Sequence, residues 1–478
     1  MPEPEPFTPD VPVLSGTYPD PSLCRVGDDY YLVTSTFEYF PAMPVFHSTD
    51  LREWRQIGHV VDRIDQLDLS AVAGSRGLFA PTIRHFEGTF YLVCTLVDGS
   101  GPQGNFVMTA KDAAGPWSDP HWLTDAAGID PSLLFHEGKS WYVGTRLRAE
   151  PDWHDQTEVW LRELDLATMT LVGEEHLLWH GAVEGAVWAE GPHIYAHDDW
   201  FYLLASEGGT EEHHAVSVAR SRTVTGPYEG NRANPVFTHR TLGIEHPITG
   251  VGHPDLIEGP DGQWWAFLLG QRPRGGYHAN LGRETFAVPV DWERGWPVFA
   301  AGVGQLAAVP GRRHIGATRL LSGLDWNQVR TAASNFYDIE GDAITLRATG
   351  ATLSDLATPA FVAVRQRHHA MRFAATLVEG DGGVALRQSE AAWLSFGLHD
   401  GRTEVRRNGE VVHTAPAGKH LEVTADDHDY RLLVDGEVVL EVDGRFLSAQ
   451  SVEGFLGVWV GVYTDDGARF EQVAYAAD

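Results

Sequence analysis

Residues 1–302 repeat one pattern of hydrophobic and polar positions five times. Each repeat holds a short aromatic and aliphatic run that follows a polar, turn-forming cluster, which is typical of a β-hairpin. The five runs cover residues 30–33, 90–93, 141–143, 201–204 and 264–267. Further strand-like runs follow each hairpin, so each repeat offers about four short strands, the content of one propeller blade. An all-β fold that begins with a five-bladed β-propeller is therefore predicted.

The repeats also share a position upstream of each hairpin. Counting back 11 residues from one aromatic position of each run reaches five residues that lie 60, 50, 60 and 63 residues apart. They are Asp20, Ala80, Asp130, Glu190 and His253. Proline follows four of them directly, and Glu190 has Pro192 one place later. Equivalent positions in a ring of blades have equivalent radii, so all five are expected to face the central channel if one does.

Three of these five positions carry carboxylates. Asp20 and Asp130 could simply form Asp-Pro turns, but their recurrence in phase with Glu190 favours a shared site. Carboxylates crowded into a channel cannot all ionise freely, so at least one pKa is expected to rise. A protonated acid beside an ionised carboxylate is what glycosidic-bond cleavage requires, where the second group either attacks the anomeric carbon or activates water.

Metal binding is the alternative for the same cluster, because three carboxylates and a histidine could hold a hard cation. Nearby aromatic side chains favour a sugar, since such rings fit the apolar faces of sugars, although core packing is an equal alternative for each ring. The aromatic residues are Phe37, Phe40, Phe79 and Trp188. A sugar-binding propeller without catalysis is the alternative from another class. It predicts the loss of at least one in-phase carboxylate, and none is lost.

The blade pattern stops near residue 302, and a second domain follows. Residues 303–325 resemble a connector, and residues 326–478 contain alternating strands with hairpin turns such as Asn408-Gly409 and Asp435-Gly436. This pattern predicts a β-sandwich. We expect it to buttress the propeller and to lend a loop to the rim of the site, with a carbohydrate-binding module as the alternative. Residues 454–461 are the segment that could supply an aromatic ring, whereas Trp459 itself is expected in the core.

Charge and composition narrow the partners. The formal net charge of −31 argues against nucleic acid and anionic membranes, which are themselves polyanions. No run approaches the ~18 apolar residues that a membrane span needs. The acidic, proline-rich start is unlike a signal peptide, so a cytoplasmic location is expected. Cys24 and Cys94 lie in apolar runs and are expected to be buried thiols. The pair His213-His214 is expected in a solvated loop near the mouth of the channel.

Several segments together resemble glycoside hydrolase family 43, in its branch of β-xylosidases and α-L-arabinofuranosidases with a C-terminal concanavalin-like sandwich. The resemblance covers essentially the whole chain. Its segments are residues 17–22 around Asp20, 28–37, 128–132 around Asp130, 189–193 around Glu190, 252–255 around His253 and 281–286 around Arg283.

The resemblance implies an inverting mechanism and a role for each carboxylate. Asp20 would be the general base that activates water, and Glu190 the general acid. Asp130 would tune the pKa of the acid and orient it. No cofactor is required. His253 matches a histidine that, in some members, approaches a calcium ion or an ordered water in the channel.

The resemblance also indicates the substrate-binding residues. Arg283 matches an arginine that reaches into the sugar subsite, and Phe37 matches a ring that lines it. Phe79 stands where tryptophan is common in this branch, which leaves the accepted sugar open. An exo-acting β-xylosidase of short β-1,4-xylo-oligosaccharides is expected, with an α-L-arabinofuranosidase or a bifunctional enzyme as the alternative. Related enzymes often associate through their sandwich domains, so a homo-oligomer is an open expectation.

Overall fold

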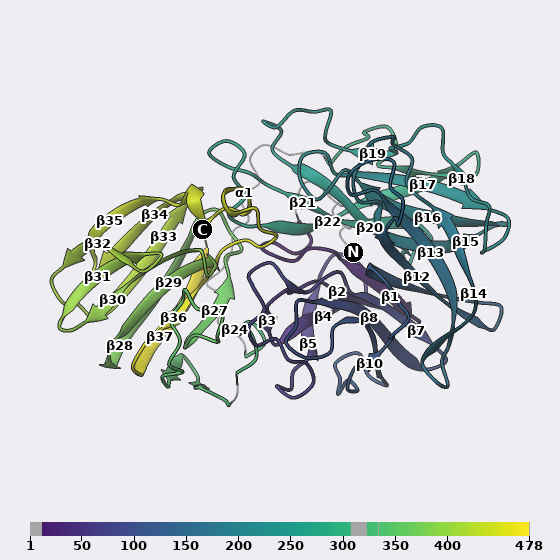
Figure 1. The fold of residues 1–478 in the computed structure, drawn as a ribbon. Coiled ribbons are helices and arrows are strands. Elements are labelled where there is room, and N and C mark those ends of the chain that lie inside the picture. Colours follow the sequence, from purple (N-terminus) through teal and green to yellow (C-terminus); the bar gives the residue numbers. More distant parts are fainter. Residues whose placement is uncertain (1–11, 307–322, 333, 478) are drawn as a thin grey trace, which may run out of the picture.

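The computed structural model describes residues 12–306, 323–332 and 334–477, and the predicted all-β fold is confirmed (Figure 1). Five antiparallel sheets form the blades of a propeller. Blades one and two contain β1 (Ser22–Val26), β2 (Asp29–Val33), β4 (Ala42–Ser48), β5 (Arg55–Val61), β6 (Gly77–Leu78), β7 (Thr82–Phe86), β8 (Thr89–Val97), β9 (Gly104–Ala110) and β10 (His121–Trp122). Blade three contains β11 (Ile129–His136), β12 (Lys139–Leu147), β13 (Thr157–Asp165) and β14 (Thr170–Trp179). Blades four and five contain β15 (Glu190–His197), β16 (Trp200–Glu207), β17 (Ala215–Ser221), β18 (Glu229–Gly230), β19 (Phe237–Thr238), β20 (Thr249–Glu258), β21 (Trp264–Gln271), β22 (Arg283–Glu293) and β23 (Trp296–Phe299).

The blades close into a ring around their inner strands. Strand β1 contacts β7, β7 contacts β11, β11 contacts β15, β15 contacts β20, and β20 returns to β1. The aromatic runs of the sequence fall in the second strands, such as β8 and β16. Neighbouring blades cover both faces of these strands, which explains why their apolar residues run together instead of alternating with polar ones. Residues before the first blade also join the last one, since the Val13 amide donates to the Thr285 carbonyl at 2.7 Å.

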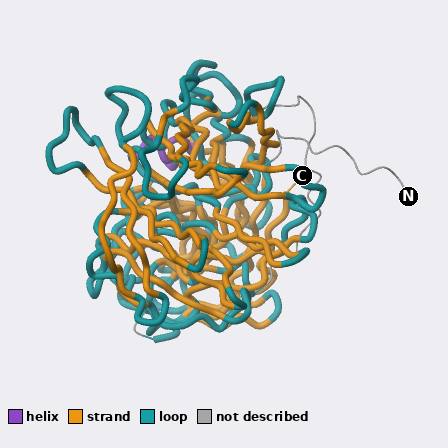
Figure 2. The backbone as a smooth tube through the Cα atoms, turned by 90° about the vertical axis from the view of Figure 1, so that its right-hand side faces the viewer, coloured by secondary structure: helices purple, strands orange, loops and turns teal. Residues whose placement is uncertain are grey.

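Two sheets packed face to face form the C-terminal β-sandwich, which lies beside the propeller (Figure 1). Seen from the propeller side, strands make up most of the backbone and loops join them at the surface (Figure 2). The eight-stranded sheet contains β3 (Tyr39–Phe40), β24 (Asn327–Val329), β27 (Phe361–Arg365), β36 (Trp459–Tyr463), β29 (Gly382–Ser389), β30 (Ala392–His399), β31 (Arg402–Arg407) and β32 (Glu410–Ala415). The seven-stranded sheet contains β25 (Tyr337–Glu340), β26 (Ala343–Leu346), β37 (Ala468–Ala477), β28 (Met371–Gly380), β33 (His420–Asp426), β34 (Asp429–Val434) and β35 (Glu437–Asp443). A short 3-10 helix η1 (Gly444–Leu447) and α1 (Ala449–Val452) follow β35.

One strand of the sandwich comes from the propeller part of the chain, and this contribution was not predicted from the sequence. Strand β3 belongs to a loop of the first blade, yet it pairs with β24, with Val329 opposite Tyr39. Trp459 is fully buried and stacks on Tyr39 with ring centroids 3.8 Å apart, so its expected place in the core is confirmed. Of the expected connector 303–325, residues 307–322 lie outside the described residues. The two domains are therefore joined by a shared sheet as well as by the chain.

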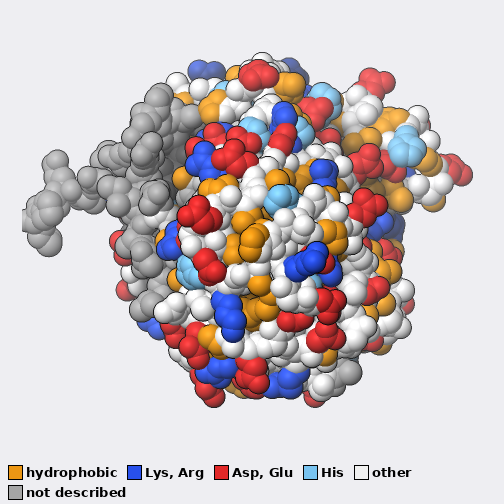
Figure 3. Space-filling model, turned by 90° about the vertical axis from the view of Figure 1, so that its left-hand side faces the viewer, with side chains coloured by type: hydrophobic (Ala, Val, Ile, Leu, Met, Phe, Trp, Pro, Cys, Tyr) orange, Lys and Arg blue, Asp and Glu red, His pale blue; other side chains and the backbone are white. Residues whose placement is uncertain are grey.

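Both cysteines have the environment that the sequence predicts. Cys24 and Cys94 are free and buried, as predicted. The sandwich end of the molecule intersperses acidic, basic and isolated hydrophobic side chains (Figure 3). Within the described parts of the chain, none of the helices has the length and apolar character needed to cross a membrane.

Candidate active site

The inner strands deliver three in-phase residues to one end of the channel. Asp20, Asp130 and His253 each have a positive φ, of 56°, 52° and 53°, and each precedes a proline. Positive φ is uncommon for residues other than glycine, and such conformations concentrate at functional sites. Together with Ala80 and Glu190, these residues line one pocket of about 580 Å³. The expectation that all five positions face the channel therefore agrees with the structure.

The assumed equivalence of Glu190 with the other four positions is wrong by one residue. In blade three, Ile129 pairs ahead of a β-bulge, and in blade four Glu190 occupies that same place. The true counterpart of Asp130 is Gly191, which has the positive φ of its blade, 58°. A Cβ at Gly191 would lie 2.7 Å from Nε2 of His253, so only glycine fits there. Glu190 therefore precedes the equivalent position by one residue and still lines the pocket. The count was off because Tyr202, and not Phe201, is the counterpart of Trp141.

Asp20 is arranged to stay ionised. Its Oδ1 accepts a hydrogen bond from Arg283 Nη1 at 3.2 Å and lies 3.6 Å from His253 Nδ1, while Oδ2 accepts from the Ser35 hydroxyl. Burial alone would raise the pKa of Asp20, but Arg283, His253 and Ser35 together hold it below its ordinary value. An ionised carboxylate in this place is suited to accept a proton from water.

Glu190 is arranged to keep its proton. Only 7% of its surface is exposed, and its Oε1 has no hydrogen-bond partner among the described residues. Burial, followed by the charges of Asp130 and Asp20, raises the pKa of Glu190 well above its ordinary value, against the opposing effect of Arg283. A buried, protonated and unpartnered carboxyl group is suited to donate a proton to a bound substrate.

Asp130 shares one property with each of these groups: its pKa is raised, as for Glu190, and its carboxylate accepts a hydrogen bond, as for Asp20. Its Oδ2 accepts the Gly191 amide at 3.1 Å, which links it to the residue next to Glu190. Burial raises the pKa of Asp130 to about 6, with His253 lowering it and Asp20 raising it. The negative charge of Asp130 is in turn one of the causes that raise the pKa of Glu190. Asp130 therefore has the position and the charge to tune the acid.

These pKa shifts predict a bell-shaped dependence of kcat/KM on pH. The rate falls at low pH as Asp20 takes up a proton, below its ordinary 3.8, and at high pH as Glu190 loses one, above its ordinary 4.5. Asp130→Asn removes a negative charge that raises the pKa of Glu190, so the basic limb is expected to move to lower pH. The acidic limb serves as the internal control, because Asp130, whose pKa is about 6, already holds its proton at the lower pH where Asp20 titrates. An unmoved basic limb would contradict the tuning role of Asp130.

Three phenylalanine rings, Phe37, Phe79 and Phe455, form an aromatic cluster on the pocket wall. Their ring centroids lie 5.6 Å (Phe37–Phe79), 5.8 Å (Phe37–Phe455) and 6.2 Å (Phe79–Phe455) apart. The Arg283 guanidinium lies 5.6 Å from the Phe37 ring and 5.3 Å from the Phe455 ring. Phe455 belongs to residues 454–461 of the sandwich, so the structure shows the expected contribution of an aromatic ring from this segment to the rim of the pocket. The individual residue was missed, because nothing local in the sequence marks Phe455 as a pocket residue.

The remaining predicted residues divide between pocket and core. Trp188 lines the pocket, whereas Phe40 is buried in the propeller core and does not. His213 lies at the pocket, as expected for a loop near the mouth. His214 is fully buried, where its ring packs on Gly252, so the expectation of two solvated histidines is wrong for it. Burial lowers the pKa of His214 to about 3, which keeps its ring neutral.

Calcium near His253 stays a prediction. Within the described residues, the set of three potential ligand atoms that converge closely is His428, Asp429 and Asp443, in the sandwich. The ring of His253 instead packs against Gly191 and faces Asp20. These contacts place the histidine ring directly beside the Asp20 carboxylate.

The pocket therefore pairs a carboxyl group of lowered pKa with one of raised pKa, beside an arginine and three aromatic rings. A second cavity of similar size, about 590 Å³, lies between the propeller and the sandwich, but its one described acidic residue, Asp325, is ion-paired with Arg367 at 2.6 Å. Acid–base chemistry thus belongs to the channel pocket. This combination of fold and site defines a glycoside hydrolase.

Comparison with known proteins identifies the family. Residues 9–297 match the model of glycosyl hydrolases family 43, and residues 321–476 match that of the β-xylosidase C-terminal concanavalin A-like domain. The chain belongs to glycoside hydrolase family 43.

Similar proteins carry two kinds of name. A xylosidase/arabinosidase of Butyrivibrio fibrisolvens is 42% identical over 385 residues, which cover 76% of this chain and 73% of that protein. The non-reducing end α-L-arabinofuranosidase BoGH43B of Bacteroides ovatus is 35% identical, and the alignment covers 96% of this chain and 91% of that protein. The crystal structure of a xylan β-1,4-xylosidase from Bacillus halodurans C-125 superposes with a TM-score of 0.87 at 28% identity, covering 98% of this chain and 99% of that one.

Proposed function

We propose that this protein is an inverting, exo-acting β-xylosidase that removes terminal xylose from short β-1,4-xylo-oligosaccharides. The observation that carries the proposal is the opposite direction of two pKa shifts in one pocket, lowered for Asp20 and raised for Glu190. A proton-bearing acid beside an ionised carboxylate is what glycosidic-bond cleavage needs, and the single-step course with inversion is what the resemblance to family 43 implies.

The proposed reaction uses each group once. Glu190 donates its proton to the glycosidic oxygen as the bond from that oxygen to the anomeric carbon breaks. Asp20 accepts a proton from a water molecule whose oxygen attacks the anomeric carbon from the opposite face. The products are the shortened sugar and a xylose of inverted anomeric configuration, and Asp20 then returns its proton to solvent while Glu190 regains one. Arg283 holds Asp20 and contributes its charge to the sugar subsite.

The shape of the pocket supports exo action. Phe455 of the sandwich lies over the propeller face and closes one side of a pocket of about 580 Å³. A pocket closed on one side accepts the end of a chain more readily than its middle. Stacking on Phe37, Phe79 and Phe455 suits the apolar face of one terminal sugar.

An α-L-arabinofuranosidase, or an enzyme with both activities, is the second candidate. Phe79 lines the pocket where the resemblance leads one to expect tryptophan, and its smaller ring leaves more room in the subsite. Xylopyranose and arabinofuranose present similar hydroxyl positions, so one pocket can accept both.

Paired aryl glycosides test the choice of substrate. The wild-type protein is expected to hydrolyse 4-nitrophenyl β-D-xylopyranoside with a higher kcat/KM than 4-nitrophenyl α-L-arabinofuranoside. Phe79→Trp, which enlarges the stacking ring, is expected to increase this preference. A preference for the arabinofuranoside would reassign the substrate and keep the mechanism, and hydrolysis of neither would overturn the proposed function.

A cytoplasmic location and a role in hemicellulose breakdown are part of this proposal. Its support is the pair of free cysteines, Cys24 and Cys94, which stay reduced most readily in a cytosolic environment.

A further inference from the structure

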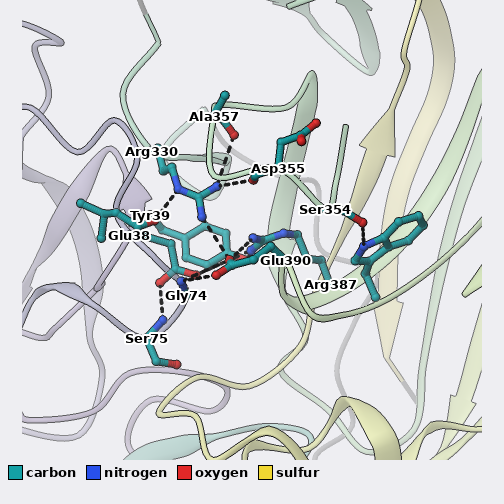
Figure 4. Close-up of polar contacts among 12 residues, drawn as sticks. Glu38, Tyr39, Gly74, Ser75, Arg330, Ser354, Asp355, Ala357, Arg387 and Glu390 are labelled. Carbon is teal, nitrogen blue, oxygen red and sulfur yellow. Dashed lines mark hydrogen bonds and ion pairs between the residues drawn. The ribbon is translucent and has the colours of Figure 1, made fainter. Parts of the chain in front are cut away.

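Four charged residues form an ion cluster where the propeller meets the sandwich, away from the catalytic carboxylates: Glu38, Arg330, Arg387 and Glu390 (Figure 4). Glu38 and Arg387 are fully buried, with Glu38 Oε1 and Arg387 Nη1 3.6 Å apart. Glu390 Oε2 accepts from Arg387 Nη2 at 3.1 Å and from Arg330 Nη2 at 3.0 Å. Glu38 comes from the propeller, whereas the other three come from the sandwich.

Both carboxylates of the ion cluster hold one loop of the propeller. The Gly74 amide donates to Glu390 Oε1 at 3.0 Å, and the Ser75 amide donates to Glu38 Oε2 at 3.0 Å (Figure 4). Ser75 has a φ of 63°, a conformation that is costly outside glycine, so these contacts fix a strained turn. The next residue, Arg76, lines the active-site pocket.

From Ser75 a line of hydrogen bonds reaches the catalytic base. The Ser75 hydroxyl accepts the Phe455 amide at 2.8 Å. The Phe455 carbonyl accepts Arg283 Nε at 3.4 Å, and Arg283 Nη1 donates to Asp20 at 3.2 Å. The same backbone that carries the Phe455 ring thus connects the ion cluster at one end to the arginine on the base at the other.

Glu38 directly follows Phe37, which is another ring of the aromatic cluster. Burial raises the pKa of Glu38 to about 7, although Arg387 and Arg330 oppose that shift. A buried charge of this kind costs free energy, and hydrophobic residues often stabilise an interface equally well. Its two carboxylate oxygens face Arg387 and the Ser75 amide, so the group is placed to hold this loop through the hydrogen bond from Ser75.

We propose that Glu38 and Ser75 are positioning residues for the sugar subsite, which place Phe455 and Arg283 through the hydrogen bonds described above. This inference rests on the proposed function for its substrate. It assigns to the interface between the domains a role in substrate binding, beyond that of joining them.

Ser75→Ala tests the proposal most cleanly, because it deletes the acceptor of the Phe455 amide and leaves the Ser75 amide on Glu38. KM for the aryl glycoside that the wild type hydrolyses is expected to rise about fivefold, as for one lost hydrogen bond, with kcat changed much less. Hydrogen exchange at the Phe455 amide, followed by mass spectrometry, is expected to become faster. Glu38→Ala is expected to raise KM further, and Glu38→Gln to restore it, because its amide oxygen still accepts from Ser75.

Thr331→Val is the matched control. The Leu69 amide donates to the Thr331 hydroxyl at 2.9 Å, so this variant removes the same type of bond between the same loop and the sandwich, but away from Phe455. Its KM and the exchange of Phe455 are expected to match the wild type. An unchanged KM in Ser75→Ala, unchanged Phe455 exchange, or an equal rise of KM in Thr331→Val would each overturn the proposal. If the wild type hydrolyses neither glycoside, the proposed function fails, and the exchange measurement still decides the positioning role.

Discussion

Glu190→Gln is expected to lower kcat on xylobiose by about 10³-fold, the usual contribution of a general acid. The glutamine amide has the shape of the carboxyl group but no proton to donate, so the glycosidic oxygen would leave as a poorly stabilised anion. Aryl glycosides with an acidic leaving group, such as 2,4-dinitrophenol, need little proton donation. Their kcat is therefore expected to stay close to that of the wild type. Steady-state kinetics on both substrates measure this difference.

Glu137→Gln is the control for this substitution. Glu137 lies exposed in the hairpin turn of blade three, so its replacement removes a carboxylate of the propeller without touching the pocket. It is expected to behave as the wild type on both substrates. An equal loss of kcat on xylobiose and on the dinitrophenyl glycoside in Glu190→Gln would contradict the assignment of Glu190 as the acid.

Asp20→Asn is expected to lower kcat by about 10³-fold on every substrate, whatever its leaving group. An amide cannot accept the proton of the attacking water, and water is needed in the same step for good and poor leaving groups alike. The substitution also removes the negative charge that pairs with Arg283, whose Nη1 lies 3.2 Å from Asp20 Oδ1. A plot of log kcat against leaving-group pKa should thus be displaced downward along its whole length.

Asp28→Asn, in the exposed turn between β1 and β2 of the same blade, is the matched control and is expected to retain wild-type kcat. Activity of Asp20→Asn within about tenfold of the wild type on any of these substrates would remove Asp20 from the role of base.

Much of the propeller could be predicted from sequence because each blade buries a similar hairpin. The repeated aromatic runs and the Asp-Pro pairs mark the inner strands, which brought Asp20, Asp130 and His253 to the pocket as expected. The count failed by one at Glu190, because the aromatic run of blade four begins one residue earlier, so that Tyr202 and not Phe201 is the counterpart of Trp141. Only strand pairing shows that Gly191, pressed against His253, occupies the equivalent place.

Contacts between distant segments could not be predicted in the same way. Phe455 reaches the pocket because the sandwich docks on the propeller, and β3 joins a sandwich sheet from within the first blade. Neither contact leaves a periodic pattern, since each depends on how two domains pack. The role of Glu38 could not be predicted for the same reason, because it depends on Arg387 across the interface and on Ser75 in another loop of the propeller.

The central claim is that water activated by Asp20 attacks while Glu190 protonates the departing oxygen, in one step with inversion. Proton NMR during the first minutes of 4-nitrophenyl β-D-xylopyranoside hydrolysis tests it directly, because all the xylose comes from the cleaved residue and its anomeric signals appear before mutarotation mixes them. α-Xylose is expected to accumulate first, and the β-anomer is expected to grow in later. Initial release of β-xylose would mean a covalent intermediate and retention, and would contradict the roles given to Asp20 and Glu190.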